Sequence, residues 1–167
     1  MTTLYSIRSA SEADIPAIQQ LAEATWEPTY SKILTQEQIT YMFGLIYTEK
    51  ALLQQMKEGQ KFMLLQEQER PIGFASISEK DVAQQVYKLN KIYLHPHYQG
   101  KGLGKVLLSS AEAAALTHGA QVLDLNVNRH NRALHFYQAC GYTLLQEVDI
   151  PIGPFWMNDY ILRKKLY

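Results

Sequence analysis

A glycine-rich loop that leads into a helix is the feature that most constrains the fold of this chain. The segment Gln99-Gly100-Lys101-Gly102-Leu103-Gly104 follows an apolar stretch with the pattern of a strand and precedes a helical pattern over about 103–118. Three glycines in five positions let the backbone turn tightly and approach a ligand closely. The first amides of a helix are unpaired donors with a partial positive charge. This unit could therefore hold a pyrophosphate.

The glycine spacing by itself leaves the role of the loop open. A complete dinucleotide-binding pattern, G-x-G-x-x-G, would need a glycine at Lys105 or Leu107. The P-loop pattern fails because Val106 stands where Ser or Thr is required. A tight turn that starts a helix is an equally good interpretation of the loop alone. Lys101 and Lys105 would add positive charge near a phosphate.

Hydrophobic periodicity along the rest of the chain predicts a mixed α/β (α+β) order of elements. Ser11 or Asp14 is expected to cap a first helix that runs towards Thr25. Just beyond Thr25, the segment around Pro28 is expected to interrupt this helix. Further helices are expected at about 35–43, 48–57, 103–118 and 131–140. Strands are expected near Tyr5 and at about 62–65, 72–77, 86–94, 122–127, 142–150 and 156–165. The change of alternation phase between Phe74 and Ala75 indicates a bulge.

Composition narrows the classes of protein that this chain can represent. Its 167 residues suit a single domain, residues 1–167, and its formal net charge of zero argues against non-specific nucleic-acid binding. The lone Cys140 excludes an intrachain disulfide, and the scattered histidines favour no metal. No segment has the apolar length of a membrane span. The start, Met1-Thr2-Thr3-Leu4, lacks the pattern of a secretory signal, so we expect a cytoplasmic location.

A second group of motifs gives the glycine loop a context. Asn131-x-Ala133 leads to Phe136-Tyr137, and Gly141-Tyr142 follows. Together with Ile92-Tyr93-Leu94-His95-Pro96, Gln99-x-x-Gly102-x-Gly104 and Leu125-x-Val127, these pieces occur in the order typical of one family. The chain resembles the GNAT superfamily of acetyl-CoA-dependent N-acetyltransferases over about residues 86–142. The resemblance implies a mixed, mostly antiparallel central sheet flanked by helices, with strands splayed at the acetyl-CoA site.

The resemblance also implies which residues bind acetyl-CoA. Backbone groups of Ile92, Tyr93 and Leu94 would line the pantetheine arm, and one of their amides could polarise the thioester carbonyl. The loop would hold the pyrophosphate; its residues are Gln99, Gly100, Lys101, Gly102, Leu103, Gly104 and Lys105. The side chain of Asn131 would bond the pantetheine arm, although an ordinary helix cap is an equally good interpretation of this residue.

Tyr137 matches the family position that often protonates the departing CoA thiolate. A phenol can donate a proton or a hydrogen bond to a thiolate. The alternative is an aromatic side chain that is half-buried on an amphipathic helix. The sequence therefore predicts Tyr137 as the general acid of a direct transfer.

The general base is left open by the sequence. Many relatives carry a Glu on the strand before the loop, but this chain has Lys88-Leu89-Asn90-Lys91 there. Asp124 is one alternative. A water held by Tyr93, Asn126 or Asn90 is another.

Two aromatic segments are candidates for binding an acceptor amine. Trp26 and Tyr30 lie near Glu27, and Trp156 lies near Asp159; aromatic faces and carboxylates both attract an ammonium group. Asp124 is a further candidate, and ordinary core packing is the competing interpretation. These segments loosely resemble PaiA-type polyamine acetyltransferases, which makes a small primary amine, including a polyamine, the expected acceptor. A non-catalytic acyl-CoA-binding module, a peptide or protein acetyltransferase, and assembly as a homodimer stay open.

Overall fold

The computed structural model describes residues 4–167 as a seven-stranded sheet with helices on both faces. The strand order is β1-β2-β3-β4-β5-β7-β6, and only the β4–β5 pair is parallel. The strands are β1 (Tyr5–Ser9), β2 (Lys61–Glu67), β3 (Arg70–Asp81), β4 (Val86–Leu94), β5 (Val122–Asn128), β6 (Thr143–Ile152) and β7 (Phe155–Lys165). The predicted mixed and mostly antiparallel sheet is confirmed.

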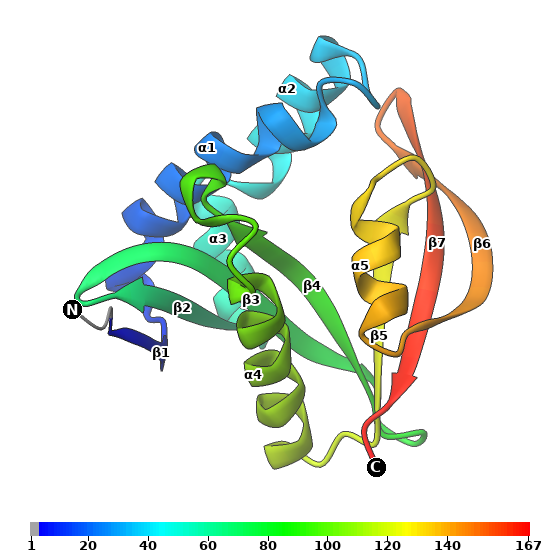
Figure 1. The fold of residues 1–167 in the computed structure, drawn as a ribbon. Helices are drawn as coiled ribbons and strands as arrows, with labels where there is room; N and C mark the ends of the chain where they lie inside the picture. The colour runs from blue at the N-terminus through cyan, green and yellow to red at the C-terminus, as the bar shows by residue number, and fades with distance from the viewer. Residues whose placement is uncertain (1–3) are drawn as a thin grey trace.

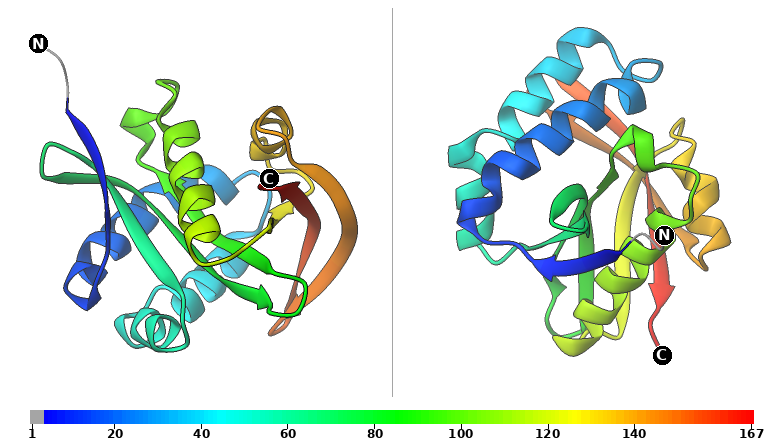
Figure 2. Two further views of the ribbon diagram at one scale, coloured as in Figure 1. Left: turned by 90° about the horizontal axis from the view of Figure 1, so that it is seen from below. Right: turned by 60° about the vertical axis from the view of Figure 1, so that its left-hand side comes forward.

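The helices divide between the two faces of the sheet, as Figure 2 shows. One face carries α1 (Ile15–Tyr30), α2 (Gln36–Ile46) and α3 (Glu49–Lys57), and the other carries α4 (Leu103–Thr117) and α5 (Ala133–Ala139). Each face has its own buried cluster: Ile18, Leu52 and Phe74 belong to the first, and Leu107 and Leu123 to the second. Burial of these apolar surfaces against the sheet is the main favourable contribution to folding.

Side-chain caps explain where the early helices begin. The hydroxyls of Thr35 and Thr48 accept hydrogen bonds from the first turns of α2 and α3. Before α1, a short 3-10 turn (Glu12–Asp14) starts at Ser11, whose backbone N–H donates to the Asp14 carboxylate over 2.9 Å. Among residues 4–167, no helix is both long and apolar enough to cross a membrane. Residues 1–3, on which the expectation of no secretory signal partly depends, lie outside the described range.

The predicted interruption of the first helix at Pro28 is wrong. Helix α1 continues through Pro28 to Tyr30, although a proline has no N–H to donate to the carbonyl four residues earlier. Trp26 and Tyr30 are both buried and stand one helical turn apart, so continuing the helix places both rings in the core. Packing therefore outweighs the local preference, and α1 extends far enough for Tyr30 to reach the middle of the sheet.

A bulge bends β4 away from β5. Ser76 of β3 pairs with Lys91 and Ile77 pairs with Leu89, which leaves Asn90 as an extra residue in β4. The parallel pairing of β4 with β5 ends at Leu89 opposite Leu125. Beyond this point the two strands diverge, as Figure 1 shows. The sequence predicts a bulge in the hairpin of residues 62–77, at the phase change between Phe74 and Ala75. That hairpin does contain a bulge, but two residues earlier: a register shift between β2 and β3 leaves Ile72 as the extra residue in β3.

An ion-pair cluster holds the closed end of the sheet, where β4 and β5 are still paired. The side chain of Asp124 on β5 is fully buried. It accepts hydrogen bonds from Lys80 at 2.7 Å and from Arg163 at 2.7 and 2.9 Å, which joins β5 to β3 and β7. Burial acts to raise the pKa of Asp124, but the hydrogen bonds from Arg163 and Lys80 outweigh it and lower the pKa below its usual value.

Replacing Asp124 with Asn should destabilise the fold by about 3 kcal/mol at pH 7, because two cations would lose their buried partner. The contribution of Asp124 is present above its unfolded pKa of about 3.9 and is lost as the pH falls through its lower folded pKa. Urea unfolding at pH 7 and pH 3 measures both effects. Asp149→Asn, which removes an exposed ion pair with Arg129, is the control and should cost less than about 1 kcal/mol. Equal losses for the two variants would contradict the assignment.

Candidate functional site

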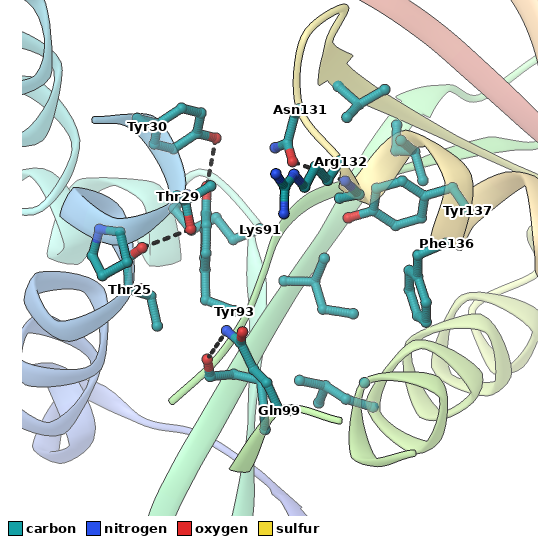
Figure 3. Close-up of a pocket in the computed structure, with 18 of the residues that line it drawn as sticks. Thr25, Thr29, Tyr30, Lys91, Tyr93, Gln99, Asn131, Arg132, Phe136 and Tyr137 are labelled. Atoms are coloured by element: carbon teal, nitrogen blue, oxygen red, sulfur yellow. Dashed lines mark hydrogen bonds between the residues drawn. The ribbon is translucent and has the colours of Figure 1, made fainter. Parts of the chain in front are cut away.

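The diverging strands open a cleft of about 760 Å³. Its walls come from the end of α1, the outer half of β4, the loop before α4, the outer half of β5 and the start of α5. Figure 3 shows α1 side chains on one side of this space and α5 side chains on the other. The cleft lies at the carboxyl ends of the two parallel strands, which is where ligands bind in sheets of this kind.

The structure brings most of the predicted site residues together in this cleft. Those that line it are Tyr30, Ile92, Tyr93, Leu94, Gln99, Gly100, Gly102, Gly104, Lys105, Asn131 and Tyr137. Five predicted residues do not line it: Trp26, Lys101, Leu103, Asp124 and Trp156. The two groups come from different kinds of evidence, since the first derives mainly from the glycine loop and the family motifs and the second mainly from residue type.

The glycine loop forms an open cradle at the start of α4. Gly100 and Gly102 have φ angles of +79° and +80°, which L side chains rarely adopt. Nothing lies within 4 Å of a Cβ built at either position, so the requirement for glycine is conformational. The first backbone bond of α4 runs from the Val106 N–H to the Gly102 carbonyl. Within the described residues, the amides of 103–105 have no backbone acceptor and can donate to a ligand.

Neighbouring side chains fix the position of this loop. Gln99 donates through Nε2 to the Leu94 carbonyl over 3.0 Å, which ties the loop to the end of β4. The Lys101 ammonium lies 5.3 Å from the centre of the Tyr98 ring and outside the cleft lining. A Cβ at Gly104 would stand 3.7 Å from the Phe136 ring, so α4 and α5 approach closely there. Of the two loop lysines, Lys105 lines the cleft.

The opposite wall of the cleft is formed by α5. The Tyr137 hydroxyl points from α5 into the cleft, as Figure 3 shows, and no hydrogen-bond partner for it occurs among the described residues. Burial, with a smaller effect from Tyr30, raises the pKa of Tyr137, so this phenol stays protonated at neutral pH. Asn131 accepts from the Ala133 N–H over 2.9 Å through Oδ1, as a helix cap does. Its amide nitrogen is left available to the cleft.

Aromatic side chains close the α1 side of the cleft. The hydroxyls of Tyr30 and Tyr93 are 3.2 Å apart, and burial raises the pKa of both residues. Trp26 packs behind them and donates through Nε1 to the hydroxyl of Tyr47 over 3.2 Å, so it supports the wall without lining it. The Trp26 side chain therefore acts through packing on Tyr30, whose ring centre is 4.7 Å away.

Two further candidates for acceptor binding lie elsewhere. Asp124 is occupied by its ion pairs at the closed end of the sheet. Trp156 is 57% exposed, and the nearby Gln38 amide bonds its carbonyl. No group of His, Cys, Asp or Glu within residues 4–167 is arranged to hold a metal ion.

Lys91 is a cleft residue whose environment the sequence did not reveal. It is 7% exposed, and its ammonium donates to Gln55 at 2.6 Å and to Gln60 at 2.9 Å. Burial, with a smaller effect from the Lys88 charge, lowers the pKa of Lys91 to about 7. A lysine in the middle of an apolar strand pattern was a possible signal, but the glutamines that surround it come from α3 and the following loop.

The sequence of residues 15–142 matches the Acetyltransferase (GNAT) family. The chain belongs to the GNAT family. The GNAT chain is 28% identical over 165 residues to a spermidine N(1)-acetyltransferase of Thermoplasma acidophilum, with 95% of this chain and 96% of the relative covered. It is 26% identical over 171 residues to an uncharacterised N-acetyltransferase of Lactobacillus delbrueckii subsp. lactis, with 98% and 99% covered.

Comparison of structures gives the same family. The crystal structure of the PaiA N-acetyltransferase from Thermoplasma acidophilum in complex with coenzyme A matches this GNAT chain with a TM-score of 0.82. The two are 25% identical, and 97% of this chain and 99% of that chain are covered. The chain is thus an N-acetyltransferase with the GNAT fold, and the family supports its use of acetyl-CoA. The open cradle and its free amides fit a diphosphate, which the residues of the loop would hold.

The stability of the protein should rise with pH because of Lys91. Between pH 7 and about pH 10 the unfolded chain binds a proton at this lysine that the folded chain does not, so unfolding becomes less favourable as the pH rises. Relative to Lys91→Met, the wild-type free energy of unfolding should increase by up to about 4 kcal/mol over this interval. Urea unfolding at three pH values measures the change. The exposed Lys105→Met variant is the control and should follow the wild type; a constant difference for Lys91→Met would contradict the prediction.

Proposed function

We propose that this GNAT N-acetyltransferase moves the acetyl group of acetyl-CoA directly to a primary amine of a small molecule. The proposal rests on two features of the chain that open into the same cleft. The free amides at the start of α4 and the Tyr137 hydroxyl both open into the space where β4 leaves β5. The two features are suited to an anionic tail and to a leaving thiolate, respectively.

Different parts of the cleft suit different parts of acetyl-CoA. The loop of Gly100–Lys105 would hold the pyrophosphate of acetyl-CoA through backbone amides, with the Lys105 charge nearby. Backbone groups of Ile92 to Leu94 would bind the pantetheine arm, because no described strand pairs with the outer half of β4 on its β5 side. The Asn131 amide nitrogen would donate to the same arm. One of the β4 amides would stabilise negative charge on the carbonyl oxygen.

Tyr137 would act at the end of the transfer. Its phenol is protonated and lacks a competing hydrogen bond among the described residues, so it can donate to the sulfur as the carbon–sulfur bond breaks. Tyr30 and Tyr93 would shape the acceptor side, where their linked hydroxyls can accept a hydrogen bond from an amine. A polyamine is one acceptor to test, since the Thermoplasma relative is named for spermidine.

The experiment that tests this function is a thiol-release assay with acetyl-CoA and a panel of polyamines, amino acids, aminosugars and peptide N-termini. We expect turnover with at least one small amine. Calorimetry with coenzyme A gives an independent measure of binding. Binding without turnover on any amine would favour a non-catalytic acyl-CoA-binding module, and turnover confined to peptides would favour a peptide or protein acetyltransferase.

Tyr137→Phe should reduce turnover by about 100-fold and leave the affinity for coenzyme A nearly unchanged, because only the proton donor is removed. Steady-state kinetics and calorimetry measure the two effects. Tyr142→Phe is the matched control: Tyr142 is buried 6.0 Å from the Tyr137 ring, but its hydroxyl donates to Glu112 and does not line the cleft. The control should keep its turnover. Full activity of Tyr137→Phe would exclude the proposed acid.

A further inference from the structure

Two aspartates are buried in the described part of the chain, and they differ in their partners. Both oxygens of Asp124 are held by cations. Asp159 on β7 is 5% exposed, and only its Oδ2 is bonded, over 3.4 Å, by the Asn126 amide. Its Oδ1 is buried and receives no hydrogen bond from any described group. Buried carboxylate oxygens are nearly always bonded, so this exception calls for an explanation.

The position of Asp159 connects it to the cleft. It stands opposite Asn128 on β5, in the half of β5 that has parted from β4. Asn126, which bonds Asp159, is itself part of the cleft lining. Asp159 therefore lies one side chain behind the wall of the cleft.

Electrostatic effects involving Tyr30 connect Asp159 with Tyr137, the proposed general acid. The charge of Asp159 contributes to the raised pKa of Tyr30, and Tyr30 in turn contributes to that of Tyr137. Tyr30 thus lies within electrostatic range of both residues. A proton acceptor and a proton donor are present around the same part of the cleft.

The reaction needs a proton acceptor, and no carboxylate on the described wall of the cleft supplies it. An amine is an ammonium ion at neutral pH and must lose a proton before it can attack the carbonyl. Among the described residues that line the cleft there is no Asp or Glu. We propose that Asp159 is the general base, and that Oδ1 receives the proton of the acceptor ammonium through one water held between Asn126 and Tyr30. This inference rests on the proposed function.

The proton balance of the step is complete. One proton passes from the ammonium through the water to Oδ1, and the nitrogen lone pair then forms the bond to the carbonyl carbon. The carbon–sulfur bond breaks with its electron pair on sulfur, which takes the Tyr137 proton. The nitrogen loses a second proton, which restores the phenol, and Asp159 releases its proton to solvent. The net products are the amide, the free thiol and one proton.

The surroundings of Asp159 raise its pKa above the usual value, which makes its carboxylate a better proton acceptor. Burial raises its pKa, while the Asn126 hydrogen bond and the charges of Lys88 and Arg129 act in the opposite direction. Lys88 approaches from β4, Arg129 from the end of β5 and Tyr30 from α1. From β6, the residue opposite Asp159 is the uncharged Val148.

The test is the pH profile of kcat/KM for Asp159→Asn, with spermidine or the best amine of the panel as acceptor. We expect a loss of about 100-fold at pH 7. The loss should shrink about tenfold per pH unit as the pH approaches the amine's own pKa of about 10, because the free amine then needs no base. A structural defect would give a deficit that does not change with pH. Asp159→Glu should recover part of the activity, and the exposed Asp149→Asn should match the wild type.

A thermal-unfolding measurement gives a second readout that does not depend on turnover. Because the folded pKa of Asp159 is raised, its ionised form opposes folding above its unfolded pKa, so Asp159→Asn should have an equal or higher Tm at pH 8. A lower Tm with a pH-independent loss of activity would overturn the assignment, as would full activity of Asp159→Asn. A wild type that acetylates no amine would instead refute the proposed function.

Discussion

The structure depends on the separation of β4 from β5 beyond Leu89. A parallel pair inside a sheet normally bonds along its whole length, because unpaired backbone groups are costly to bury. The extra residue at Asn90 bends β4 and ends this pairing half-way along the strand. The unsatisfied backbone then lies beside the free amides at the start of α4, and both become available to one elongated ligand.

The two ends of the split sheet are stabilised in opposite ways. At the paired end, Asp124 is saturated by Lys80 and Arg163, which fixes three strands together. At the open end, no group among residues 4–167 donates to one oxygen of Asp159, and none of the carboxylates in that range pairs with Lys91. Buried groups with incomplete partners lower stability, and they concentrate where chemistry needs groups of shifted pKa. The same face of the sheet thus carries a structural carboxylate and a reactive one in our account.

The sequence was sufficient for the parts of the site that are local. The loop of Gly100–Gly104 and the start of α4 follow from glycine positions and helical periodicity, and the aromatic pair on α5 follows from the resemblance to the GNAT family. The continuation of α1 through Pro28 did not follow, because it depends on where Trp26 and Tyr30 pack against distant strands. The partners of Asp124 and Asp159 depend on cross-strand register, which residue types alone do not fix.

The central claim is that the unpaired backbone amides at the start of α4 and in the outer half of β4 bind coenzyme A. Amide hydrogen exchange followed by NMR, with and without saturating coenzyme A, tests it at single residues. The account predicts slower exchange at Gly102–Lys105 and in the outer half of β4, and little change in β1 and β2. Unchanged exchange at both places in the presence of millimolar coenzyme A would contradict it.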